Sequence, residues 1–184
     1  MNDFSICKLK LLIKPYFISI CLIFIIIICP LSSCSKNKYK AIMYSQSSDW
    51  ILSSFLEENK VRGAEYLNPL YNEFDYAIDA YYYDETSPDD RTFIIDNIDT
   101  YNTIFNENML TIDFDKQIIY LYTFASTSPR DYLIDKISIK EEQLNIYYKL
   151  KKSNMKDATN PHQRCLIVVM DKTNTSSVKF IEKN

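Results

Sequence analysis

Glycine is almost missing from this 184-residue chain, which contains only Gly63. Loops that cradle phosphates or dinucleotides need several glycines at fixed spacing, because only glycine lets the backbone approach the ligand so closely. Histidine is as scarce, since His162 is the sole one, and one histidine cannot build a multi-histidine metal site. We therefore expect no cofactor and no metal site, and we expect His162 to be exposed in a loop.

An excess of positive charge is also missing. The chain has 21 Lys and Arg against 24 Asp and Glu, a formal charge of −3. Nucleic-acid binding requires a clustered positive field, so we expect no nucleic-acid partner. Lysines gather at positions 36–40, which we expect near anionic lipid head groups, and at 149–156, which we interpret as the solvated side and end of a strand.

The N-terminal region has the pattern of a secretory leader. Three lysines precede an apolar run of fourteen residues, 16–29, in which Ser19 is the only clearly polar side chain. A membrane-spanning helix needs about twenty apolar residues, whereas about 10–14 is typical of a signal-peptide core. The order of positive and then apolar residues is that of a secretory signal.

The residues that follow this run, Leu31-Ser32-Ser33-Cys34, resemble the bacterial lipobox. The resemblance implies that the Cys34 sulfur takes a diacylglyceryl group and that cleavage makes Cys34 the new N-terminus. Two or three acyl chains hold a protein on a bilayer without a transmembrane helix. An ordinary signal cleaved near Ser33 and an uncleaved short anchor are the alternatives.

The lipobox predicts the layout of the chain. Residues 1–33 would be a removed signal peptide, 34–40 a polar tether, and 41–184 a single domain outside the cytoplasm, lipid-anchored to the cell membrane or outer membrane. The remaining cysteine, Cys165, lies in an apolar run and reads as a small buried hydrophobe rather than a nucleophile. With Cys34 acylated, the mature chain can form no intramolecular disulfide.

The mature chain is rich in tyrosine and phenylalanine, which suit a pleated sheet. Its period of apolar residues predicts an α+β domain with a mixed, mainly antiparallel sheet and one or two short helices. A helix is expected at 49–60, although alternation keeps a strand open there. A second helix is expected at 97–105, with Asp96 or Asn97 as its cap.

Strands are expected wherever apolar residues alternate or run together. The run 117–124 is apolar on both faces, which predicts a central strand covered on both sides. Segments 136–140 and 144–151 predict one hairpin, and segments 165–170 and 177–181 predict a second. The remaining expected strands are 41–44, which could also simply pack on the body, 74–83 and 92–95.

Two acidic clusters suggest chemistry, and each has a simpler interpretation. Residues 84–90 hold four carboxylates that could attract calcium, but they lack the ligand order and the glycine of an EF-hand loop, so a solvated surface loop is favoured. Asp113 and Asp115 would share one face of a strand, as in an acid–base pair. A turn before the next strand is the favoured interpretation, and we assign no catalytic residue.

The order of several segments in the second half of the chain is informative. These segments are Phe93–Asp96, Ile112–Phe114, Arg130–Ile134, Pro161, Cys165–Met170 and Val178–Phe180. In this order they resemble the PrcB-like C-terminal domain family, which is associated with a secreted protease complex, although Arg130-Asp131 stand where that family usually has glycines. The resemblance implies a small mixed sheet with a helix, and protein contacts rather than catalysis.

These features predict a non-catalytic protein-binding module at the cell envelope, with the bilayer and an envelope or secreted protein as partners. Tyrosine is enriched in contact hot spots, so Tyr81, Tyr83 and Tyr147 are candidate contacts, together with the 153–164 loop that holds His162. Alternatively, these tyrosines belong to a second packed layer. A small-molecule or carbohydrate-binding lipoprotein is the rival function, and an enzyme with paired carboxylates is the third.

Overall fold

The computed structural model describes residues 39–45, 48–75 and 77–183. The chain divides into residues 1–38 and a compact unit of residues 39–184. The predictions for the leader, the lipobox and Cys34 therefore lie outside the described residues. Among the residues that are described, there is no helix with the length and apolar character needed to cross a membrane.

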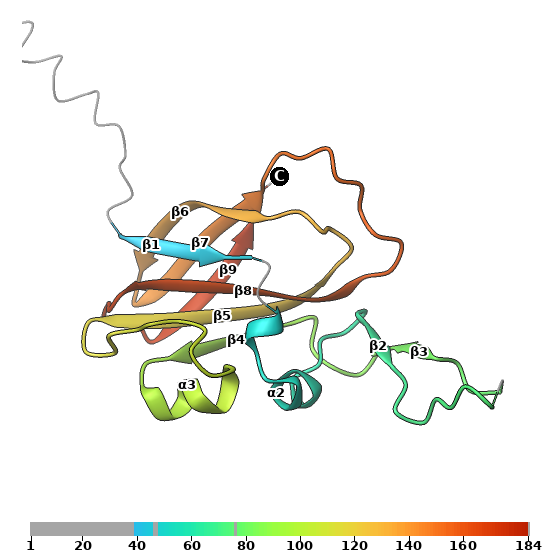
Figure 1. Cartoon of the computed structure of the whole chain (residues 1–184). Helices are drawn as coiled ribbons and strands as arrows, with labels where there is room; N and C mark the ends of the chain where they lie inside the picture. The colour runs from blue at the N-terminus through green and yellow to red at the C-terminus, as the bar shows by residue number, and fades with distance from the viewer. Residues whose placement is uncertain (1–38, 46–47, 76, 184) are drawn as a thin grey trace, which may run out of the picture. The chain divides into compact units, whose positions relative to one another are not determined.

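A four-stranded antiparallel sheet forms the middle layer of the unit (Figure 1). Strands β5 and β8 pair over ten residues at its centre, and all side chains of 118–124 and 165–170 are buried. The prediction of a central strand covered on both faces is confirmed. In spatial order the strands are β1 (Ala41–Tyr44), β8 (His162–Asp171), β5 (Gln117–Ser126) and β4 (Asp90–Ile95).

A second sheet packs on one face of the first and contains β6 (Tyr132–Lys140), β7 (Gln143–Leu150) and β9 (Ser177–Glu182). The predicted β6–β7 hairpin is confirmed, and its turn places Glu141 and Glu142 at positive φ. The predicted hairpin of β8 with β9 is wrong. Strand β8 already has β1 and β5 as neighbours, so the chain crosses to the other sheet and β9 pairs in parallel with β7.

Aromatic rings fill the space between the two sheets. Tyr122 stacks on Phe180 with ring centroids 4.7 Å apart, and Phe124 and Tyr148 pack beside them. Offset stacking adds to the free energy that burial of these rings contributes. Most of the aromatic residues of the second half of the chain therefore hold the sandwich together.

Two short helices cover the other face of the four-stranded sheet: α2 (Ser53–Glu58) and α3 (Ile98–Ile104). The predicted helix near 97–105 is confirmed, and the Asn97 side chain accepts a hydrogen bond from the Thr100 N–H at 2.8 Å. The predicted helix at 49–60 is broken into a 3-10 turn, η2 (Ser48–Trp50), and α2. The cause is Ile51, which forms a β-bridge with Phe105 and interrupts the helix.

The described unit is thus a small domain dominated by antiparallel sheets with two α-helices. The fold class is confirmed in that coarse form. The structure is richer in sheet than the predicted α+β domain, because two packed sheets and a separate ribbon take the place of one sheet. The ribbon consists of β2 (Glu65–Leu67) and β3 (Tyr81–Tyr83).

Candidate protein-binding site

The two-stranded ribbon and its connection project from one end of the sheets in Figure 1. We call residues 65–83 the aromatic arm; Tyr76 within it lies outside the described residues. Strands β2 and β3 pair from Glu65 opposite Tyr83 to Leu67 opposite Tyr81. The thirteen residues between the strands form a loop of turns.

The predicted strand 74–83 is wrong except for its last three residues. Three polar side chains bend the chain instead, each accepting from the backbone N–H two residues further on. Asn68 accepts from Leu70 at 3.0 Å, Asn72 from Phe74 at 3.1 Å and Asp75 from Ala77 at 3.1 Å. Such Asx turns replace the strand's backbone pairing. The alternating apolar residues of this segment therefore do not line one face of a sheet.

Large apolar side chains are concentrated on the arm. It contributes six of the twelve exposed large hydrophobic residues found in the described part of the chain, so these residues are concentrated on one segment rather than scattered over the domain. Clustering of this kind marks interaction surfaces. The six, with their exposed fractions, are Leu67 (63%), Leu70 (73%), Tyr71 (43%), Phe74 (82%), Tyr81 (57%) and Tyr83 (46%).

The arm is also acidic. Its four charged side chains are all carboxylates, Glu65, Glu73, Asp75 and Asp79. Desolvation and the neighbouring Glu65 carboxylate raise the pKa of Tyr83. A binding surface built from these residues presents aromatic rings within a negative field, and it favours a partner with an apolar surface and positive charge.

The root of the arm is held firmly. Tyr66 is buried with Val61 and Ala64, and its hydroxyl accepts from the Val61 N–H at 2.9 Å. Lys60 donates to the Tyr82 hydroxyl at 2.6 Å and forms an ion pair with Glu57 at 2.8 Å. These hydrogen bonds, with Glu57 first, raise the pKa of Lys60. The exposed residues are thus presented by a fixed base.

The loop after the arm is organised by its first carboxylate. Asp84 is buried, and it accepts from the N–H and hydroxyl groups of both Thr86 and Ser87. The Ser87 N–H is the largest of the contributions that lower the pKa of Asp84, to about 2. The other acidic residues of 84–90 are exposed. Within the described residues there is no group of three or more His, Cys, Asp or Glu placed to hold a metal ion.

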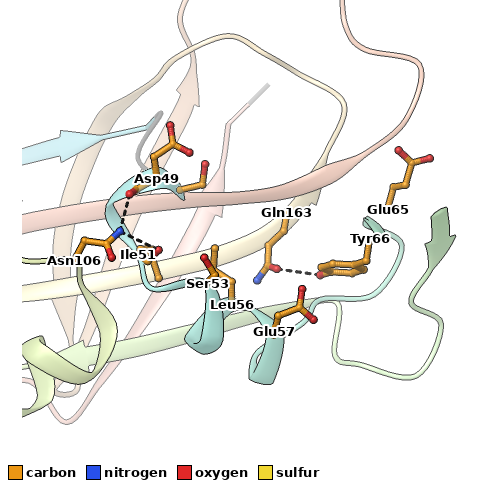
Figure 2. A pocket seen from close by; sticks show the side chains of 10 residues that line it. Asp49, Ile51, Ser53, Leu56, Glu57, Glu65, Tyr66, Asn106 and Gln163 are labelled. Carbon is orange, nitrogen blue, oxygen red and sulfur yellow. Dashed lines mark hydrogen bonds between the residues drawn. The ribbon is translucent and has the colours of Figure 1, made fainter. Parts of the chain in front are cut away.

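A hollow of about 470 Å³ lies between α2 and the root of the arm (Figure 2). Two of its polar side chains are already hydrogen-bonded within the protein: Gln163 accepts from the Tyr66 hydroxyl at 3.1 Å and donates to the Asn59 carbonyl, and Asn106 donates to the Asp49 carbonyl at 2.8 Å. One aromatic ring, that of Tyr66, lines the hollow. The site therefore lacks the aromatic lining expected of a carbohydrate pocket.

The structure separates the predicted contact residues into two places. Tyr81 and Tyr83 are exposed on the arm and do not belong to a packed layer. His162 is exposed, but its predicted loop position is wrong, because it begins β8 by pairing with Ser126. It follows Pro161, whose carbonyl accepts from the Glu65 N–H at 2.8 Å, so it lies near the root of the arm.

Tyr147 lies elsewhere, on the outer face of the second sheet. Its ring is half-buried, with the ammonium groups of Lys183 and Lys136 at 4.8 and 6.0 Å from the ring centre. It is therefore part of a basic surface and does not extend the aromatic arm.

Two other sequence predictions concern possible chemistry. The turn predicted at Asp113–Lys116 is confirmed: Asp113 accepts from the Asp115 N–H at 3.1 Å and from Lys116, which lowers the pKa of Asp113. Cys165 is buried, as predicted, and burial raises its pKa to about 12. A thiol with that pKa is protonated at neutral pH.

Comparisons with protein-family models, curated proteins and solved structures gave no match for this chain. The resemblance to the PrcB-like domain family therefore stays a prediction. Sequence reasoning missed Leu67, Leu70, Tyr71 and Phe74 as members of the candidate site. The available signal was Asn68-Pro69 and Asn72, turn-forming residues set among apolar ones.

Proposed function

We propose that this protein is a lipid-anchored lipoprotein of the cell envelope whose domain binds another protein through the aromatic arm and has no catalytic role. The observation that carries the binding proposal is the cluster of six exposed apolar side chains on residues 67–83. Aromatic residues supply most of the binding energy in many interfaces. Because the root of the arm is held by hydrogen bonds, the arm loses less conformational entropy when it binds a partner.

The rival function, binding of a small molecule or carbohydrate, requires aromatic rings around a pocket. In the described residues, six aromatic side chains pack in the core between the sheets, and the hollow beside the arm has a single aromatic ring. The exposed rings are on a protruding arm. This arrangement supports a protein partner over an enclosed ligand.

The anchor is tested by replacing Cys34 with Ala and supplying a labelled fatty acid to growing cells. We expect the wild-type protein to carry the label and the variant to lose it, because the sulfur of Cys34 is the attachment point that the lipobox implies. Equal labelling of the two proteins would contradict the anchor.

The binding surface is tested by placing a photo-crosslinking amino acid at Tyr81 of the full chain in cell envelopes. We expect a saturable adduct with one protein, whereas the same group at Ile98, which is 54% exposed on α3, should give none. Because hot-spot residues dominate affinity, Leu70→Ser with Phe74→Ser should weaken binding at least about tenfold.

The matched control is Ile98→Ser, which removes an exposed apolar side chain away from the arm and should leave the adduct at Tyr81 unchanged. An adduct that persists in the Leu70→Ser, Phe74→Ser variant would contradict the proposed site. Circular dichroism of each variant checks that the sheets are intact.

A further inference from the structure

Charge is divided unevenly along the domain. Residues 39–115 have sixteen acidic and four basic side chains, whereas residues 116–184 have twelve basic and seven acidic ones. The first part includes the arm and both helices, and the second includes all three strands of the second sheet. A domain with net negative charge thus has a positive region.

The positive charge is concentrated on the outer face of the second sheet. Alternation along β6, β7 and β9 turns their apolar residues inward and their lysines outward. Asp135, at the bulge in β6, lies among them and pairs with one lysine. We call this surface the lysine face; its six members are Lys136, Lys140, Lys149, Lys151, Lys179 and Lys183, all exposed.

Half of these lysines form no close ion pair with a carboxylate of the described residues, although Lys183 acts on Asp135 at longer range. Lys149 pairs with Asp135, Lys151 lies 3.9 Å from Asp131, and Lys140 lies 3.6 Å from Glu141. No ion pair within the described chain involves the other three, and two of them lie near the Tyr147 ring. Like charges on neighbouring strands repel one another, so an anionic partner would relieve that repulsion.

A groove of about 610 Å³ lies where β7 and β9 end, and it is lined by Leu133, Leu150, Lys149, Lys151, Lys152, Lys183 and one carboxylate, Glu182. Leu133, on β6, is 44% exposed, while the Tyr147 ring is half-buried. A surface with several separate lysines and few aromatic side chains suits contact with an extended anionic surface. It is less suited to a protein interface, because aromatic hot spots supply much of the affinity there.

The start of the domain lies beside this face. Strand β1 contacts β6, and the Ser45 hydroxyl, just after β1, donates to Asp131, just before β6, at 3.1 Å. The two strands run in opposite directions in Figure 1, so the start of β1 lies toward the Lys140 end of β6. Tyr39 is the fifth residue after Cys34, so the chain between them can span at most about 18 Å.

We propose that the lysine face docks on the anionic surface of the bilayer in which Cys34 is anchored. This inference rests on the proposed lipid anchor. The tether places the face within reach of the head groups, and each lysine near an anionic surface strengthens attachment by about fivefold. The anchor and the face then act together, as one acyl group and a polybasic patch do in two-signal attachment.

The test measures the reactivity of individual lysines toward an amine-acylating reagent by mass spectrometry. The acylated full chain is reconstituted into phosphatidylcholine vesicles with or without about 30% phosphatidylglycerol, which makes the surface anionic. We expect Lys136, Lys149 and Lys179 to react at least about threefold more slowly on the anionic vesicles. About 0.5 M salt should abolish this protection by screening. Lys116, which is exposed just before β5 and is not part of the lysine face, should react equally on both.

Two triple variants that lose the same net charge distinguish an effect of the lysine face from an effect of the protein's overall charge. Lys136→Gln, Lys179→Gln and Lys183→Gln together should remove the protection of Lys149. Lys116→Gln, Lys156→Gln and Lys172→Gln together should preserve it. Because these side chains are exposed, both variants should fold.

Three results would overturn the proposal. The first is equal lysine reactivity on neutral and anionic vesicles. The second is loss of protection in the control variant as well. The third is protection without vesicles that grows with protein concentration, because a second copy would then cover the face. A mass spectrum of the N-terminal peptide reports Cys34 acylation separately, so an unacylated chain overturns the anchor while the footprint still decides whether the face meets anionic vesicles.

Discussion

The aromatic arm and the lysine face differ in both polarity and charge. The arm has six exposed apolar side chains, four carboxylates and no cation, and polar side chains shape its loop. The face has six lysines, four on three paired strands and two just after strand ends, and its ring, Tyr147, is half-buried. Apolar burial gives close, specific contact, whereas spread charge gives weak, salt-dependent attraction. If both proposals hold, this small domain divides partner binding and membrane contact between two surfaces of different chemistry.

The largest expected difference between the two regions is the contribution of their tyrosines to the stability of the fold. Tyr66→Ala should destabilise the protein by about 3 kcal/mol, because it empties a buried site at the root of the arm. Tyr66→Phe should cost about 1–2 kcal/mol, since the buried Val61 N–H loses its acceptor. Tyr147→Ala should cost below about 1 kcal/mol, because its cation–π contacts are with exposed lysines.

Urea unfolding of the three variants measures these differences in the free energy of unfolding. Tyr81→Ala is the matched exposed control on the arm and should change stability by less than about 0.5 kcal/mol. A cost for Tyr66→Ala no larger than that of Tyr81→Ala would show that the root of the arm is not fixed.

A smaller effect is expected on how stability depends on pH, through Asp84 in the loop that follows the arm. The pKa of Asp84 is lowered to about 2 in the folded protein, from 3.8, so its carboxylate stabilises the fold above about pH 4. That contribution is lost as the pH falls through about 2. A shift of this size corresponds to at most about 2 kcal/mol.

The measurement is urea unfolding of the wild type and Asp84→Asn at several pH values between 2 and 6. The stability difference between the two proteins should shrink as the pH falls across that window. Asp89→Asn is the control, since Asp89 is exposed. A difference that stays constant with pH would show that the Asp84 carboxylate does not hold the loop.

Local pattern was enough to predict several elements. The run 117–124 has no polar face, which only a strand covered on both sides can satisfy, and Asn97 is a cap with a helical apolar period after it. The β6–β7 hairpin followed from alternation on either side of a short polar turn. In each case the residues that decide the structure lie within a few positions of one another.

Pairing between distant segments could not be predicted in the same way. The segments 165–170 and 177–181 alternate as a hairpin would, and nothing local shows that β8 already has two neighbours. The prediction of a strand at 74–83 was wrong for a related reason. Its apolar residues alternate from Phe74 onward, but the Asn68, Asn72 and Asp75 side chains compete with strand pairing, and their turns take the place of the strand and leave Phe74 exposed.

The amino-acid sequence alone specifies which functional groups the protein has. It has no glycine-rich loop and one histidine, its first part is acidic, and in its second part lysines alternate with apolar residues. The sequence also predicts the lipid anchor, because a lipobox is a local signal. Only the tertiary structure decided that Tyr81 belongs to an exposed arm while Tyr147 lies among lysines. Exposure and charge clustering depend on which strands pair, and that pairing brings together residues far apart in the chain.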